Sequence, residues 1–248
     1  MPILLDQAIC IRQWDWSETS QTVSLFTREH GLVRGIGKGS KREKSAFSGG
    51  FELLTRGELG ALVKPSADLA NLTSWDLQET FPAIRRTLPA FYAAMYLADL
   101  VQHALHERDP HAALFDSLLA ALRELDGPES NAAAVLRFQW STLVETGYRP
   151  VLDADIVSGG PLAAAKIHAF LPRQGGFTVD PAPQSAPGPV WRIRAETLEL
   201  LRGLSAGGGG GGDLATLDRA SRFLAAYLRE ILGREVPAAA TLFGDLKV

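Results

Sequence analysis

The sequence contains one cysteine, Cys10, among 248 residues. A single cysteine excludes an intramolecular disulfide and any zinc site built from cysteines. Its apolar neighbours indicate a buried core thiol rather than a nucleophile. No stretch approaches about eighteen uninterrupted apolar residues, and the N-terminal residues lack a basic leader with a cleavage site. We therefore expect neither a membrane-spanning helix nor a secretory signal, and a cytoplasmic location.

The sequence also lacks an overall excess of positive charge. Its formal net charge is −3, which argues against a protein that coats nucleic acid over its whole surface. The cations are instead concentrated between residues 27 and 44, where only Glu29 and Glu43 oppose them. The positive residues of this stretch are Arg28, Arg34, Lys38, Lys41, Arg42 and Lys44.

These cations lie on an expected β-hairpin. Residues 22–27 alternate polar and apolar side chains, residues 29–31 predict a tight turn, and residues 32–36 begin a second strand. The second strand leads into a glycine-rich basic segment that we expect to be a mobile loop. Cations displace counterions from a nucleic-acid backbone, and glycines let the main chain approach closely. The stretch therefore predicts phosphate contacts with nucleic acid.

The glycines of this loop superficially resemble a nucleotide-binding loop. That motif requires a lysine followed directly by Ser or Thr, with its glycines at a fixed spacing and a helix beginning there. Here Gly39 follows Lys38, and no helical pattern begins after Ser40. The sequence therefore does not predict an ATP site.

Residues 1–78 are expected to form a small β-barrel. Besides the hairpin, short strand-like runs occur at 6–13, 51–56, 58–63 and 68–72, with glycine turns between them. A compact barrel of such strands is typical of the OB-fold, which binds single strands with a charged groove and stacking aromatics. The candidates for stacking, each of which could instead belong to the core, are Trp14, Trp16, Phe47 and Phe51.

Helical spacing replaces the strand pattern from residue 76 to about residue 149. The expected helices are 89–105, 114–125, 132–146, 195–204 and one that begins after Asp213, and the expected later strands are 166–170 and 190–193. We assign residues 79–150 and 194–248 to a helical domain, and residues 151–193 to a loop-rich region. The glycine run 207–212 is expected to be a flexible linker.

Possible metal ligands gather near the expected end of the first of these helices. His103, His106 and Glu107 have a spacing that places them on one helical face, with His111 close by. The simpler interpretation is a solvated helix terminus, where histidines interact favourably with the helix dipole. We favour the simpler interpretation, because no further ligand shell is visible nearby.

Several motifs follow one another along most of the chain. They are residues 16–20 (Trp-Ser-Glu-Thr-Ser), Leu25-Phe26-Thr27, Gly31, Gly37-Lys38-Gly39, Leu114-Phe115 with the helix 118–125, Leu136-Arg137-Phe138, Gly147-Tyr148, the helix 219–232 and Leu242-Phe243. In order and spacing they resemble the RecO family of bacterial recombination mediators. The resemblance implies an OB-fold followed by a helical bundle, so the expected fold class is α+β.

The resemblance also implies, for many members, a four-cysteine zinc site between the bundle and the C-terminus. Here residues 155–159 (Asp-Ile-Val-Ser-Gly) stand where the family has C-x-x-C-G, and the second cysteine pair after Gly175-Gly176 is absent. We therefore expect a degenerate, cysteine-free zinc-finger-like region, with no metal or other cofactor carried over. Asp153 and Asp155 suit a hard cation, but two carboxylates on a loop are weak grounds for a site.

By resemblance, the chain is expected to be a non-enzymatic, nucleoid-associated mediator in RecFOR-type DNA repair and recombination. It would bind single- and double-stranded DNA, anneal complementary strands, and help load RecA onto DNA coated by single-strand-binding protein (SSB). The expected protein partners are RecR and the acidic C-terminal tail of SSB, with Arg137 as the candidate contact for the tail. The alternative is a scaffold that recruits RecR and SSB without direct DNA contact. No Ser-His-Asp order or paired-carboxylate motif favours an enzyme.

Overall fold

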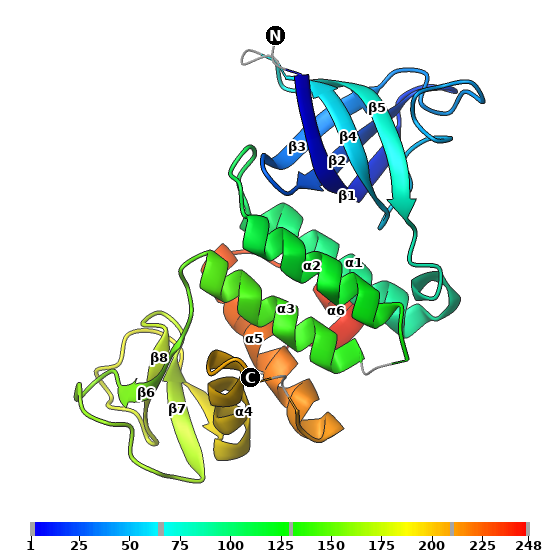
Figure 1. Cartoon of the computed structure of the whole chain (residues 1–248). Helices are drawn as coiled ribbons and strands as arrows, with labels where there is room; N and C mark the ends of the chain where they lie inside the picture. Colours follow the sequence, from blue (N-terminus) through cyan, green and yellow to red (C-terminus); the bar gives the residue numbers. More distant parts are fainter. Residues whose placement is uncertain (1–2, 64–66, 129–130, 209–210, 247–248) are drawn as a thin grey trace. The chain divides into compact units, whose positions relative to one another are not determined.

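The computed structural model describes residues 3–63, 67–128, 131–208 and 211–246. The chain divides into two compact units, residues 1–129 and residues 130–248, and each combines β-strands with helices (Figure 1). The expected α+β fold class is therefore confirmed. None of the described helices is long and apolar enough to cross a lipid bilayer.

The first unit begins with a closed barrel of five strands. The strands are β1 (Ile3–Asp15), β2 (Gln21–Thr27), β3 (Gly31–Gly37), β4 (Arg56–Leu62) and β5 (Ala70–Glu79). They are hydrogen-bonded in the order β1-β2-β3-β5-β4, and β4 pairs with β1 to close the barrel. Every pair is antiparallel except β3 with β5. This arrangement is the OB-fold that the sequence predicts.

Alternate side chains of the strands fill the inside of the barrel. Val23 and Leu25 of β2 and Leu59 of β4 belong to one buried cluster that also contains Trp75 of β5. Successive residues of a strand point to opposite faces, so every second side chain enters the core. Each wall of the barrel therefore has an inner apolar face and an outer face that is available for other contacts.

Two helices, α1 (Leu88–Ala104) and α2 (Ala112–Leu125), complete the first unit. A short 3₁₀ turn (Ile84–Arg86) leads into α1, and both helices lie beside one end of the barrel (Figure 1). The ring of Phe26 on β2 packs edge-on against Phe115 of α2, with centroids 5.7 Å apart. Arg12 of β1 pairs at 2.5 Å with the buried carboxylate of Asp99 on α1. The helices thus cover part of the outer barrel wall with an aromatic contact and a paired buried charge.

The segment after α1 covers an edge of the barrel. β3 pairs with β5 only from Gly35 to Gly37, and earlier in β3 Leu32 forms a bridge with Glu107. Gly31 lies so close to Asp109 that a Cβ on the glycine would come within 2.1 Å of the Asp109 carbonyl oxygen. Its φ of 68° is also in the left-handed region. Only glycine fits there, and the resulting close contact protects the strand edge.

The second unit contains a four-stranded sheet and, among the described residues, four helices. Its strands, in the order β6-β8-β7-β9, are β6 (Val151–Asp155), β8 (Gly176–Val179), β7 (Ile167–Leu171) and β9 (Trp191–Arg194). Its helices are α3 (Asn131–Glu145), α4 (Ala195–Ser205), α5 (Leu214–Leu232) and α6 (Pro237–Phe243). Phe170 of β7 contacts the rings of Phe177, Trp191, Phe223 and Tyr227. This aromatic cluster joins the sheet to α5.

The structure corrects several expected elements. Residues 51–55 of the expected strand 51–56 form an irregular turn before β4. Residues 76–79, expected to begin the helical part, continue β5. The region 151–193, expected to be rich in loops, contains β6 and β8, which are too short to give a clear alternating pattern. The glycine run 207–212 includes residues 209–210, which lie outside the described residues.

The expected domain boundaries stay a prediction. The barrel strands end at Glu79, next to the expected boundary at residue 78. The compact units, however, group α1 and α2 with the barrel, whereas the sequence pattern assigned them to a helical domain with residues 194–248.

Candidate nucleic-acid interface

Buried polar contacts fix the segment that follows β3, residues 38–50, which we call the basic loop. The side-chain oxygen of Gln21 accepts hydrogen bonds from the Phe51 amide and the Ser40 hydroxyl, both at 3.0 Å. The side-chain nitrogen of Gln21 donates to the Phe51 carbonyl at 2.9 Å. Within the loop, the Ala46 carbonyl accepts from the Trp75 amide at 2.8 Å. Gln21 is only 4% exposed, so water competes little for these bonds. The loop expected to be mobile is therefore anchored.

Two aromatic rings, one in the basic loop and one directly after it, pack inside the barrel. Phe47 and Phe51 are 5% and 2% exposed, and the ring centroids of Phe51 and Trp75 lie 5.1 Å apart. Gly37 leaves room for them, because a Cβ there would come within 2.9 Å of the Phe51 ring. Phe47 and Phe51 therefore belong to the core and are not available to stack on bases.

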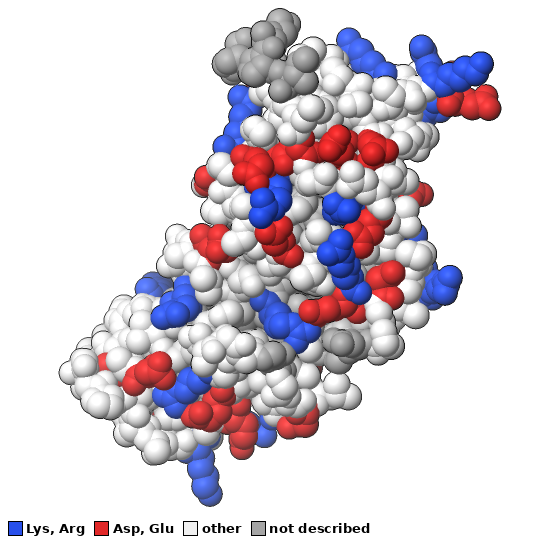
Figure 2. Space-filling view, in the orientation of Figure 1, with Lys and Arg blue, Asp and Glu red and all other residues white. Residues whose placement is uncertain are grey.

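The basic loop directs its cations to solvent. The exposed cations are Lys38, Lys41, Arg42 and Lys44. Lys41 pairs with Asp15 at 2.5 Å, whereas the other three have no ion-pair partner among the residues that the structure describes. Glu18 and Glu43 are also exposed here, so four positive charges face three negative ones. Figure 2 shows Lys and Arg atoms, with acidic atoms beside them, projecting from the corner of the barrel where this loop lies.

The end of β1 and the turn that follows it place two tryptophans beside the basic loop. Trp14 and Trp16 are 50% and 64% exposed. The turn is tied to the loop by the ion pair between Asp15 and Lys41 and by a hydrogen bond from the Lys41 amide to the Thr19 carbonyl at 3.0 Å. Exposed aromatic rings and cations therefore share this end of the barrel.

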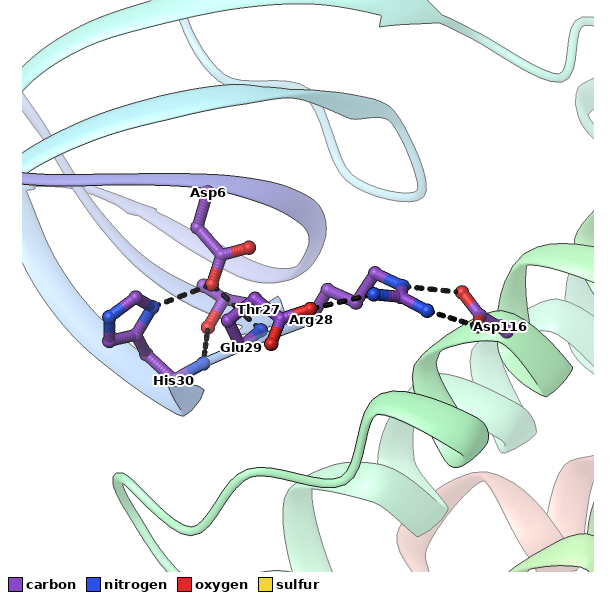
Figure 3. Close-up of polar contacts among 6 residues, drawn as sticks. All are labelled: Asp6, Thr27, Arg28, Glu29, His30 and Asp116. Atoms are coloured by element: carbon purple, nitrogen blue, oxygen red, sulfur yellow. Dashed lines mark hydrogen bonds and ion pairs between the residues drawn. The ribbon is translucent and has the colours of Figure 1, made fainter.

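Arg28 and Arg34, the other two expected DNA contacts, are paired within the chain. The guanidinium of Arg28 donates two hydrogen bonds to Asp116, at 2.9 and 2.8 Å, and one to Glu29 at 2.6 Å (Figure 3). The hydrogen bonds with Asp116 raise the pKa of Arg28 and lower the pKa of the Asp116 carboxyl. Arg34 forms an ion pair with Glu107 at 3.4 Å. Four of the six cations therefore lie on the basic loop, and the two that lie outside it are both held by carboxylates of the first unit.

Asp6 organises the turn that presents Arg28. Its Oδ2 accepts a hydrogen bond from the Glu29 amide at 2.9 Å and lies 2.8 Å from Nδ1 of His30 (Figure 3). The turn expected at residues 29–31 is confirmed. It lies at the opposite end of the β2–β3 hairpin from the basic loop, since the ladder runs from Gln21 opposite Gly37 to residue 27 opposite residue 31. Arg28 is therefore distant from the loop cations along the hairpin.

In the second unit, Asp155 lies at the position where the resemblance implies the first cysteine of a zinc site. Its buried Oδ1 accepts hydrogen bonds from the Val157 amide at 2.8 Å, the Ser158 amide at 3.1 Å and the Thr178 hydroxyl at 2.9 Å. Burial alone would raise the pKa of Asp155, but the hydrogen bonds outweigh it and lower the pKa below its ordinary value. The turn is closed by hydrogen-bond donors around one carboxylate, not by thiolates around a metal. These residues do not fit a zinc ion.

The other candidate cation ligands are also engaged elsewhere. Asp153 pairs with Arg202 at 3.0 Å. α1 ends at Ala104, before Glu107, so the expected helical face with His103 does not extend that far. Among the described residues, no group of three or more His, Cys, Asp or Glu is arranged to hold a metal ion.

Arg137, the expected contact for an acidic protein tail, belongs to the second unit. It lies on α3 between Leu136 and Phe138, which are both buried. Arg137 itself is half-buried and already engaged in an interaction within the chain. Its role in binding a tail stays a prediction.

Two family models match almost the whole chain. One, described as Recombination protein O N terminal, matches residues 1–81, and the other, Recombination protein O C terminal, matches residues 85–239. The chain belongs to the RecO family. The N-terminal RecO match covers the barrel, and the C-terminal match covers the helices and the second sheet.

Relatives named DNA repair protein RecO are similar over most of their length. The protein of Anaeromyxobacter sp. (strain Fw109-5) is 32% identical over 235 residues, which cover 93% of this chain and 91% of the relative. That of Rhodopirellula baltica is 29% identical over 198 residues, or 80% and 73% of the two chains. That of Myxococcus xanthus is 28% identical over 201 residues, or 81% and 80%. This RecO family member is therefore a DNA repair protein, as its motifs predict.

The sequence pattern identifies the cations of the candidate interface but not the residues that position them. Gln21 gives no local signal, because a polar residue at the start of a strand is ordinary. Asp116 lies 88 residues from Arg28 along the chain, and Glu107 lies 73 residues from Arg34. Ion pairs between residues so far apart leave no spacing pattern that one sequence can reveal.

Proposed function

We propose that this RecO family protein is a DNA-binding recombination mediator that acts by binding rather than by enzymatic turnover. It binds single- and double-stranded DNA through the basic end of its barrel and anneals complementary strands. It also helps load RecA onto DNA coated by SSB. Membership of the RecO family supports the assignment to DNA repair. The individual steps rest on the resemblance of the motifs and on the barrel surface.

The observation that carries this proposal is the anchored basic loop with its exposed cations. Lys38, Arg42 and Lys44 are exposed, and none has an ion-pair partner within the described residues. The loop is fixed through Gln21, so little conformational entropy is lost when it meets a phosphate backbone. Lysine contacts to phosphates carry no sequence information. The expected binding is therefore independent of DNA sequence and is weakened by salt.

Arg28 and Arg34 have a smaller part in this proposal than their charge alone suggests. Each already donates to a carboxylate of the same unit. A phosphate would have to compete with Asp116 for the Arg28 guanidinium, whose bidentate pairing is the stronger kind of charged hydrogen bond. The loop cations are consequently the first phosphate contacts, and the two arginines are secondary ones.

The test is fluorescence anisotropy of a labelled single-stranded oligonucleotide, titrated with protein at several salt concentrations. The test variant replaces Lys38, Lys41, Arg42 and Lys44 with Ala. Its affinity should fall, and the slope of log K against log salt should decrease by up to about 0.7 for each phosphate contact removed. A variant with Arg149, Arg173, Arg192 and Arg194 replaced by Ala has the same change in net charge in the second unit. Equal losses in both variants would contradict an interface at the basic loop.

A second candidate function is a protein scaffold, favoured by a pocket on the first unit. The pocket has a volume of about 430 Å³ and a mostly apolar lining. Its apolar residues are Leu4, Val33, Val63, Ala70 and Pro110, and its charged residues include Glu29, Arg34, Asp68, Glu107 and Arg108. An apolar centre with a charged rim is typical of a protein interface. Binding of purified RecR or SSB by a protein that does not bind DNA at low salt would favour the scaffold.

Binding of the acidic SSB tail through Arg137 is the remaining part of the proposal. A peptide with the SSB C-terminal sequence should bind the protein, and Arg137→Ala should weaken the peptide without changing the affinity for free DNA. Isothermal titration calorimetry measures the affinity for the peptide, and fluorescence anisotropy measures the affinity for DNA. An unchanged peptide affinity in a folded Arg137→Ala variant would contradict this assignment.

A further inference from the structure

Two of the five tryptophans of the chain are exposed, and both lie at the basic end of the barrel. Trp75, Trp140 and Trp191 are at most 9% exposed, whereas Trp14 and Trp16 are 50% and 64% exposed. Large aromatic rings contribute most to stability when they are buried. Two exposed rings, one at the end of β1 and one in the turn that follows, are therefore unlike the other tryptophans, and their exposure needs a reason outside the folding of the barrel.

Trp14 belongs to an outward-facing row of side chains that leads to the basic loop. The strand register places Trp14 opposite Thr22, and Thr22 opposite Ile36. Cross-strand partners face the same side of a sheet, and the neighbouring Val23 points into the barrel core. The row Trp14–Thr22–Ile36 therefore faces outward, and Lys38 follows Ile36 by two residues.

Trp16 is held beside the same loop by its own turn. Its backbone amide donates to the Ser20 carbonyl at 2.9 Å, and the Ser20 hydroxyl accepts from the Gly39 amide at 3.1 Å. The ion pair between Asp15 and Lys41 adds a second connection between turn and loop. Both indole rings are thus carried by backbone that is fixed relative to the exposed cations.

The balance of charge shows why cations alone would give weak binding here. Four exposed cations stand beside three exposed carboxylates, and Lys41 is already paired with Asp15. Counterion release depends on the number of phosphates that the protein neutralises, and that number is small for a patch so nearly balanced. An attraction that does not depend on net charge is needed for tight binding, and stacking of bases on aromatic rings supplies one.

We propose that Trp14 and Trp16 form a base-stacking subsite for single-stranded nucleic acid, next to the phosphate-contacting cations of the basic loop. The subsite rests on the proposed DNA binding by the same end of the barrel. Unpaired bases offer their faces to an indole ring, whereas the faces of paired bases are covered by their neighbours in the duplex. Every base has such a face, so the subsite distinguishes single strands from duplexes without reading sequence.

The experiment compares three nucleic acids of equal length: a deoxythymidine strand, a strand of abasic sites with the same phosphates, and a duplex. The variant is Trp14→Ala/Trp16→Ala, and the matched control is Tyr148→Ala, which removes an exposed aromatic ring from the second unit. The wild-type protein should bind the deoxythymidine strand roughly tenfold or more tightly than the abasic strand. The double variant should lose that advantage and keep its affinity for the abasic strand, while Tyr148→Ala should behave as wild type.

Tryptophan fluorescence reports the same contact directly, because only Trp14 and Trp16 are accessible for a base to quench. The deoxythymidine strand should quench the emission, and the abasic strand should not. Unchanged emission together with full DNA affinity in the double variant would overturn the stacking subsite while leaving DNA binding in place. An equal loss for all three nucleic acids would also contradict it, since the rings would then act on the fold, which circular dichroism detects.

Two further outcomes separate this inference from the proposed function. If no nucleic acid binds at low salt, DNA binding at this end fails and the stacking subsite fails with it. If purified RecR or SSB quenches the two tryptophans and DNA does not, the rings belong to a protein interface, and the stacking subsite is wrong. The abasic strand separates base stacking from phosphate contact, because it retains every phosphate and lacks every base.

Discussion

Asp116 on α2 holds Arg28 of the β2–β3 turn through two parallel hydrogen bonds at 2.9 and 2.8 Å. The two residues connect the barrel to a helix of the same unit. Both side chains are about half exposed, so solvent screens their attraction and the pair adds little to stability. Its main consequence concerns DNA binding, because the positive charge of Arg28 is already offset by the carboxylate of Asp116.

The pairing of Arg28 predicts a difference between two cations of the same stretch. Arg28→Ala should change DNA affinity less than Lys38→Ala, because Lys38 has no ion-pair partner among the described residues. Asp116→Asn should raise the affinity slightly at low salt, since it frees the guanidinium. Anisotropy titrations at several salt concentrations measure both effects. A decrease of the salt slope by about 0.7–0.9 in Arg28→Ala would contradict the prediction, because it would identify Arg28 as a full phosphate contact.

Asp15 restrains a second cation, Lys41, at 2.5 Å. Asp15→Asn should therefore increase DNA affinity at low salt by up to about fivefold, given that an exposed ion pair contributes at most about 1 kcal/mol. The gain should disappear as salt is raised. Asp218→Asn is the matched control, since it removes a carboxylate from an exposed ion pair with Arg222 in the second unit. The same gain in both variants would show an effect of net charge alone.

A substitution at Gln21 tests whether the anchoring of the basic loop contributes to DNA binding. Gln21→Leu keeps the approximate size of the side chain but leaves the Phe51 amide and the Ser40 hydroxyl without their partner. A buried unsatisfied group costs about 1–3 kcal/mol, so the free energy of unfolding should fall by that order. Hydrogen exchange of residues 38–50 should accelerate, and DNA affinity should decrease with every cation still present. Gln78→Leu, at an exposed position of β5 in the same barrel, is the control and should leave stability and exchange unchanged.

The sequence was most informative where structure is local. The β2–β3 hairpin is predictable from the alternating side chains of residues 22–27 and from the turn before Gly31. Both signals depend only on residues that are neighbours in the sequence. Order and spacing of short motifs also identified the family. Residues 76–79 were misassigned because their continuation of β5 depends on pairing with β4, which lies elsewhere in the sequence. Propensity gives way to such tertiary contacts.

The candidate interface was predictable in its charges and not in its architecture. The sequence does not distinguish among its four candidates for base stacking. The structure does, because Trp14 and Trp16 are exposed and Phe47 and Phe51 are buried. The difference arises because Gly37 and Gln21 fold the loop back into the barrel, and no pattern of neighbouring residues encodes that return.

Gly31 offers a test of the contact that covers the edge of β3. Gly31→Ala would place a Cβ within 2.1 Å of the Asp109 carbonyl oxygen and would also strain a backbone with φ of 68°. We expect the free energy of unfolding to fall by about 1–3 kcal/mol or more, measured by urea denaturation. Gly203→Ala is the control: it lies in α4 with no heavy atom within 4 Å of the added Cβ, so it should stabilise by up to about 1 kcal/mol.

Asp155 makes the stability of the second unit depend on pH without a metal. Its folded-state pKa is lowered by hydrogen bonds from Val157, Ser158 and Thr178 that outweigh the effect of burial. The stabilisation is therefore complete above the ordinary carboxyl pKa of about 3.9, and it is lost as the pH falls through the lower folded-state pKa. Asp155→Asn should reduce the free energy of unfolding by about 1.5–3 kcal/mol at neutral pH, the range for a hydrogen bond to a charged group.

The difference between wild type and Asp155→Asn should then narrow below about pH 4, where the wild-type carboxylate also becomes neutral. Urea denaturation followed by circular dichroism at neutral and acidic pH measures it. Asp153→Asn, on the same strand but 86% exposed at its side chain, should show neither effect. Neither zinc nor a chelator should move the unfolding midpoint of the wild type, because the turn is closed by amide and hydroxyl donors rather than by metal ligands. Two results would contradict this account of the cysteine-free region. One is an unfolding midpoint that zinc raises, and the other is a stability difference between wild type and Asp155→Asn that persists unchanged at acidic pH.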